Sequence, residues 1–161
     1  MARKAITKSY TSTVKDAYDG AISDIEMLAE EMRSWADNMS GTNLENSSKY
    51  ETVEEAANTL EGVAQEDVPP AISEISVTYT TTQFSRRHLS RATRLSHAVA
   101  ALEGVIAAAQ VWIEEREKLT QEPGDEVEGF EEAREEVTAF IDTVQQTIDE
   151  VEGVEFPGMY G

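Results

Sequence analysis

Two histidines and 32 carboxylates are the side chains in this 161-residue sequence that could do chemistry. His88 and His97 are nine residues apart, which on a helix puts them on opposite sides, so they cannot share one metal ion. A di-iron centre in a helical protein uses Glu-x-x-His, but Ser85 and Arg94 stand three residues before the two histidines. The absence of cysteine excludes disulfides and thiolate metal sites. We therefore expect no bound metal and no cofactor.

The sequence contains no motif of a common catalytic site. It has no phosphate loop, no G-x-G-x-x-G fingerprint and no G-x-S-x-G nucleophile turn. Its carboxylates fall on predicted polar helix faces, where nothing prepares them for acid–base catalysis. Two N-x-S sequons, at Asn38 and Asn46, lie in an Asn- and Ser-rich loop where such triplets are common by chance. We expect a protein that is not an enzyme.

The formal net charge of −19 at pH 7 is the strongest signal in the composition. Such a chain repels nucleic acids and anionic membranes, so we expect no direct contact with nucleic acid. Three interpretations are open: solvated Glu-rich helix faces, adaptation to high salt, where screening weakens self-repulsion, and mimicry of nucleic acid. Solvated faces are favoured because runs of charged residues commonly form solvent-exposed helix faces. Mimicry ranks lowest because the acids are mixed with arginines.

Residues 1–10 form a basic arm on this acidic chain. The arm carries Arg3, Lys4 and Lys8 and few apolar side chains. A polar terminal segment of this kind usually frays. The alternative interpretation is that the arm docks on an acidic face, for example that of a neighbouring subunit, and the sequence leaves both open.

A second basic cluster stands at the start of a predicted helix. Arg86, Arg87 and Arg91 lie where the helix dipole favours acids, so they need another partner. Internal neutralisation is favoured, by acids at the end of the last predicted helix. Those acids are Asp149, Glu150 and Glu152. The alternative is an external acidic partner or a phosphate group.

The C-terminal segment 153–161 is an aromatic tail. Phe156, Met159 and Tyr160 are large apolar side chains on a segment too short to fold alone. Because exposed apolar side chains are costly for a monomer, we expect the tail either to pack back on the helices or to insert into a neighbour.

Neither a membrane span nor a secretory signal is predicted. No run of 18 apolar residues occurs, and Glu103 interrupts the most apolar stretch. The first ten residues lack the apolar segment of a secretory signal. These observations favour a chain that stays in solution, plausibly in the cytoplasm, before it joins an assembly.

Apolar residues recur at helical spacing in four stretches of the chain. The stretch 98–113 is apolar over most of its circumference, so we expect it in the central, most buried helix. Ser48, with Glu51 three residues later, predicts a capping box at the start of the second helix. A short turn at 122–124 predicts that the last two helices are antiparallel neighbours. The predicted helices span 12–39, 49–65, 85–121 and 126–152.

Residues 71–84 separate the second and third predicted helices and are prone to form a strand. Ile75, Val77 and Tyr79 alternate with polar residues, and three threonines follow. One strand alone cannot satisfy its backbone groups. A connector laid along the helices is favoured, and pairing of this strand with another chain is the alternative.

Together these patterns predict an all-α fold. We expect a bundle of four principal helices in residues 11–152, with a β-prone or extended crossover at 71–84 and short arms at 1–10 and 153–161. The predicted function is structural: a non-enzymatic subunit that associates with copies of itself or docks into a larger assembly. A virus particle is one example of such an assembly. The alternative is an acidic regulatory module, such as an inhibitor or chaperone, that binds a basic protein. The predicted contact residues are Arg3, Lys4, Lys8, Ile75, Val77, Tyr79, Arg86, Arg87, Arg91, Phe156, Met159 and Tyr160.

Overall fold

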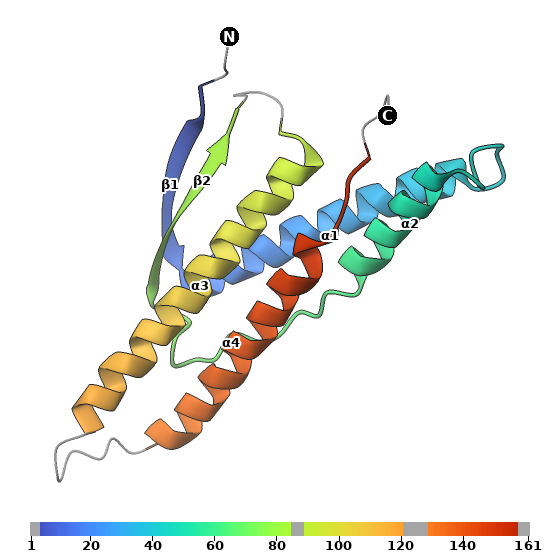
Figure 1. Ribbon diagram of the computed structural model, residues 1–161. Coiled ribbons are helices and arrows are strands. Elements are labelled where there is room, and N and C mark those ends of the chain that lie inside the picture. Colours follow the sequence, from blue (N-terminus) through green and yellow to red (C-terminus); the bar gives the residue numbers. More distant parts are fainter. Residues whose placement is uncertain (1–3, 85–88, 121–128, 158–161) are drawn as a thin grey trace.

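A computed structural model describes residues 4–84, 89–120 and 129–157, and this part of the chain is mostly helical (Figure 1). It contains four helices and two strands. In chain order they are β1 (Ile6–Thr13), α1 (Val14–Met39), α2 (Ser48–Glu61), β2 (Ser76–Gln83), α3 (Arg91–Thr120) and α4 (Phe130–Glu152). The expected helical character is confirmed. The all-α prediction holds only in part, because β1 and β2 pair with each other as a small antiparallel sheet.

The first two helices begin at capping residues, which the sequence predicts to within a few positions. The Thr13 side chain accepts a hydrogen bond from the Asp16 N–H at 3.1 Å and so begins α1. The cap of α2 is Ser47, which accepts from the Tyr50 N–H at 3.1 Å; the predicted cap, Ser48, is the first helical residue. Hydrophobic periodicity locates a helix, but it does not decide which of two neighbouring serines is the capping residue.

Helices α3 and α4 both begin later in the chain than predicted. Helix α3 begins at Arg91, and the Ser90 hydroxyl accepts from the Thr93 N–H at 3.1 Å. Helix α4 begins at Phe130 after Gly129, whose φ of 81° breaks the helical path. The predicted starts at 85 and 126 and the turn at 122–124 lie outside the described residues. Helices α3 and α4 run antiparallel side by side, as expected (Figure 1).

Helix α1, and not α3, contributes more of the fully buried large side chains than any other element. Its buried side includes Tyr18, Ile25 and Met32, and Tyr18 also meets Phe140 of α4 edge-on at 5.0 Å between ring centroids. The prediction that 98–113 is the most buried helix is therefore wrong. Helix α3 contacts α1, α4 and β2, but its wide apolar surface leaves residues such as Val111 exposed.

By length and composition alone, Arg91–Leu119 of α3 is long and apolar enough to cross a membrane, with a mean hydropathy of 1.3. Of the 18-residue window of this helix that reaches this hydropathy, 33% is buried inside the fold. The contacts of α3 with α1, α4 and β2 account for the buried part of its apolar surface.

The two strands form a ribbon with two different faces. Tyr10 lies opposite Tyr79, and their rings stack at 5.4 Å between centroids on the face that meets the helices. The other face carries only Ser and Thr side chains, in four cross-strand pairs. These pairs are Thr7–Thr82, Ser9–Thr80, Thr11–Thr78 and Thr13–Ser76. The segment predicted to fray or dock thus becomes a strand from residue 6 onward, and the partner of 76–83 belongs to the same chain.

Gly104 is the point where the ribbon rests on α3. A Cβ atom there would lie 3.0 Å from Val77 Cγ1 and 3.2 Å from Tyr79 Cβ. A glycine in the middle of a helix costs about 1 kcal/mol relative to alanine, so its presence needs a structural reason. That reason is the close approach of β2, which no larger residue would permit without displacement.

This contact gives the first prediction. Gly20→Ala in α1 should raise the free energy of unfolding by up to about 1 kcal/mol, because nothing lies within 4 Å of the added atom. The free energy of unfolding of Gly104→Ala should be lower than that of Gly20→Ala by at least about 1 kcal/mol, because the new methyl group meets Val77 and Tyr79. Urea unfolding followed by circular dichroism measures both. Equal gains in the two variants would contradict the close packing of β2 on α3.

Candidate functional site

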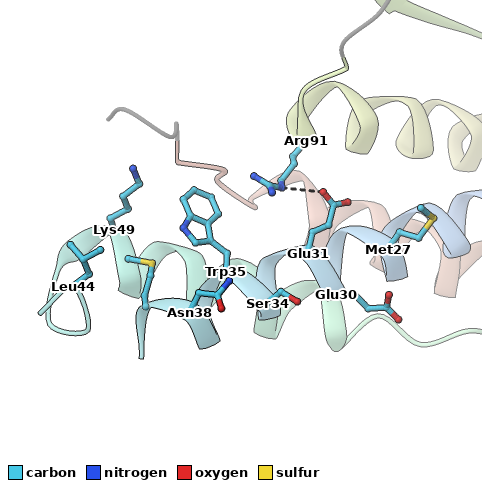
Figure 2. Close-up of a pocket in the computed structure, with 10 residues that line it drawn as sticks. Met27, Glu30, Glu31, Ser34, Trp35, Asn38, Leu44, Lys49 and Arg91 are labelled. Atoms are coloured by element: carbon cyan, nitrogen blue, oxygen red, sulfur yellow. Dashed lines mark ion pairs between the residues drawn. The ribbon is translucent and has the colours of Figure 1, made fainter. Parts of the chain in front are cut away.

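A groove of about 950 Å³ opens between α1, the loop that follows it and the starts of α2 and α3 (Figure 2). Helix α1 supplies most of its wall. The lining residues are Met27, Glu30, Glu31, Ser34, Trp35, Asn38, Met39, Leu44, Lys49 and Arg91. The groove is lined by large apolar side chains with charged groups among them, a composition typical of protein-contact sites.

Trp35 stands in this groove between two cations (Figure 2). The Lys49 Nζ lies 5.6 Å from the ring centroid and the Arg91 Cζ lies 5.2 Å from it. Each such contact is worth about 0.5–1 kcal/mol at a partly exposed site. Met27 and Leu44 flank the groove and are 52% and 53% exposed. The groove therefore presents a held aromatic ring together with apolar side chains that the fold leaves uncovered.

Glu31 of α1 joins the groove to the start of α3 through ion pairs with two arginines. Arg94 makes a two-pronged ion pair with its carboxylate, and Arg91 Nε lies 3.4 Å from Glu31 Oε1. The hydrogen bonds and charge of Arg94, aided by Arg91, hold the pKa of Glu31 below its ordinary value. Internal neutralisation is thus confirmed for the described part of the arginine cluster. The expected partners at the end of α4 are wrong: the acid that meets Arg91 comes from α1.

The other predicted contact residues are scattered over the fold. Lys4 and Lys8 are exposed, and Lys8 lies on β1 opposite Thr81. Val77 is buried against α3, whereas Ile75 and Tyr79 are half-buried against the core. Of the predicted residues that the structure describes, Arg91 alone lines the Trp35 groove. The sites Arg3, Arg86, Arg87, Met159 and Tyr160 lie outside the described residues.

Phe156 packs back onto the helices. It is half-buried against the core and lines a hollow together with Val151 of α4 and with Leu95 and Val99 of α3. Packing back on the helices is one of the two outcomes expected for the tail. The aromatic ring thereby forms part of the wall between the start of α3 and the end of α4.

Sequence patterns missed the Trp35 groove because Trp35 follows Val14, Ala21 and Leu28 at seven-residue spacing, which predicts a position on the packed side of the helix. Two signals could have found it. Met27 falls on the polar side of the predicted helix 12–39, and Leu44 stands in a loop of Gly, Asn and Ser residues. Apolar side chains in polar surroundings are the mark of a contact surface, and here the two lie on the same groove.

A second, smaller hollow of about 230 Å³ lies under the ribbon. Asp24, Tyr79, Thr81 and His97 line part of it, and His97 Nε2 is 3.3 Å from the Thr82 carbonyl oxygen. Burial raises the pKa of the Asp24 carboxyl, and Arg94 and His97 oppose that rise. Among the described residues, no group of three or more His, Cys, Asp or Glu side chains could hold a metal ion. The hollow therefore offers a polar support for the ribbon and no ligand set for a cation.

The Glu31 contacts predict a stability that depends on pH. Glu31→Gln should lower the free energy of unfolding at pH 7 by up to about 1 kcal/mol, since the pair is partly exposed. Because the folded pKa is lowered, the stabilisation is present above the ordinary value of 4.5 and is lost as the pH falls through the lowered pKa. The difference between wild type and variant should thus vanish in acid. Glu30→Gln is the matched control, because no ion pair or hydrogen bond to Glu30 occurs among the described residues.

Comparisons with known proteins give no relative for this arrangement. No protein-family model, no curated protein and no solved structure matches the chain. The helices, the ribbon and the Trp35 groove are thus the basis on which a function can be argued.

Proposed function

We propose that this chain is a non-enzymatic assembly subunit that associates with copies of itself, and that the Trp35 groove is one of its contact surfaces. The groove carries the proposal, because it leaves Met27 and Leu44 about half exposed beside a held tryptophan. Tryptophan and arginine are the residues that most often dominate protein-contact energies. The scaffold we infer is a four-helix bundle, supported by the contacts α1–α2, α1–α3, α3–α4 and α2–α4.

Charge supports a copy of this chain as the occupant of the groove. Glu30 and Glu31 are balanced there by Lys49 and Arg91, whereas the whole chain carries −19. Two acidic chains repel each other, so they approach most easily at surfaces whose local charge cancels. A strongly cationic partner would instead be drawn to the uncompensated acids on the helices.

The non-enzymatic part of the proposal rests on the charged groups of the groove. The pKa of Glu31 is lowered by Arg94, whereas a general base near neutrality needs a raised one. Glu31 is thereby kept as the anionic half of an ion pair. The alternative function remains an acidic regulatory module for a basic protein, which would be a monomer with salt-sensitive affinity for cationic chains.

Tryptophan fluorescence tests the groove directly. In Trp112→Phe, Trp35 is the sole tryptophan, and an aromatic ring stays beside Phe130. Raising the protein concentration should shift the emission of Trp35 to shorter wavelength, in step with the mass from light scattering. Multimolar salt should strengthen the association, because it screens the repulsion between acidic chains.

Two leucines provide a matched comparison. Leu44→Ala in the groove should weaken association measurably, whereas Leu119→Ala near the end of α3 should not, although the two are 53% and 55% exposed. A well-folded monomer at every concentration and both salts would contradict the assembly proposal. That result would favour the acidic binding module.

A further inference from the structure

The ribbon has one covered edge and one open edge. The outer edge of β2 faces α3: His97 reaches the Thr82 carbonyl oxygen at 3.3 Å, and the Thr78 carbonyl oxygen lies 3.7 Å from where a Gly104 Cβ would be. Figure 1 shows β1 on the outside of the molecule, with β2 between it and α3. Within the described residues, β1 contacts β2 and α1 and no other element.

The ladder geometry identifies the backbone groups on the open edge. The Val14 N–H donates to the Ile75 carbonyl oxygen at 2.8 Å, which fixes the alternation of bonded and non-bonded pairs. By that alternation the N–H and C=O groups of Thr7, Ser9 and Thr11 point away from β2. This edge of eight residues has no proline and no bulge, and Lys8 is its one charged side chain, so little on it opposes pairing with another strand provided that Lys8 does not face a second lysine.

Charge singles out the ribbon as a place where two such chains can meet. Each of the four helices carries four or more acidic residues. Residues 4–15 and 75–84, which contain the ribbon, carry three lysines and no acid. Among the described elements, the two strands therefore carry the fewest charged side chains, with Lys8 as the one charge on them, so a second copy meets few like charges there.

We propose that β1 pairs antiparallel with β1 of a second copy, which makes a continuous four-stranded sheet. This rests on the proposed self-association and names an interface for it distinct from the Trp35 groove. A two-fold axis at Tyr10 places Tyr10 opposite its own copy and extends the Tyr79–Tyr10 stack across the axis. Lys8 then lies opposite Ser12, and the two lysines avoid each other. A register centred on Lys8 would oppose like charges directly.

Disulfide trapping tests the register, because the chain has no cysteine of its own. In the proposed register Tyr10→Cys brings two thiols together in a non-bonded pair, with Cα atoms about 4.5 Å apart, within reach of a disulfide. Lys8→Cys, on the same strand and face, leaves its thiols roughly 13 Å apart. Mild oxidation should therefore link Tyr10→Cys into a covalent dimer and leave Lys8→Cys unlinked. Equal linkage of both variants would overturn the register.

A proline tests the edge itself. Ser9→Pro removes an N–H that points away from β2, so the β1–β2 ladder should survive. The dimer should weaken by at least about tenfold, because each copy loses an edge hydrogen bond and presents a ring in its place. Ser9→Ala keeps the N–H and should dimerise like wild type. Circular dichroism and thermal unfolding of the monomers check that each variant is folded.

The results separate this inference from the proposed function. Loss of the dimer in Ser9→Pro but not in Ser9→Ala supports pairing through β1. Association that is unchanged in Ser9→Pro but weakened in Leu44→Ala would overturn the β1 interface and leave the assembly proposal standing. Monomers in wild type at every concentration would overturn both.

Discussion

The close approach of β2 to α3 at Gly104 is the constraint on which the rest of the structure depends. It brings the ribbon onto the helices, covers one edge of β2 and leaves the hydroxyl-lined face and the β1 edge in solvent. The same approach positions His97 at the Thr82 carbonyl oxygen and closes the polar hollow around Asp24. A side chain at this point would press against Val77 and Tyr79 and push β2 away from α3.

Charge is distributed unevenly over this fold. The helices carry most of the acids, the ribbon carries none, and the Trp35 groove balances two glutamates against two cations. In a chain of −19, every surface of low local charge is a place where another acidic chain is repelled less. Arg91 and Arg94 are half-buried and join α3 to α1 through Glu31, which lines the groove.

The sequence predicts the elements of this protein better than their partners. Periodicity along one segment is a local signal, so α1 and α4 are found with nearly correct bounds. Pairing of β1 with β2 is not local, because Thr11 and Thr78 are 67 residues apart and nothing in a mostly polar first segment signals a strand partner. The groove was missed for the same reason: Trp35, Leu44 and Arg91 come from three elements that only the fold brings together.

The separation of the two strands along the chain has a consequence for folding. Residue 6 must find residue 83 after two helices have intervened, and closing so long a loop has a substantial entropic cost before any ladder bond forms. Helix pairs such as α1 with α2 close much shorter loops. During synthesis β1 emerges before β2 and stays unpaired until residues 76–83 have followed it. The strand that bears the open edge is therefore also the strand that stays unpaired longest in the newborn chain.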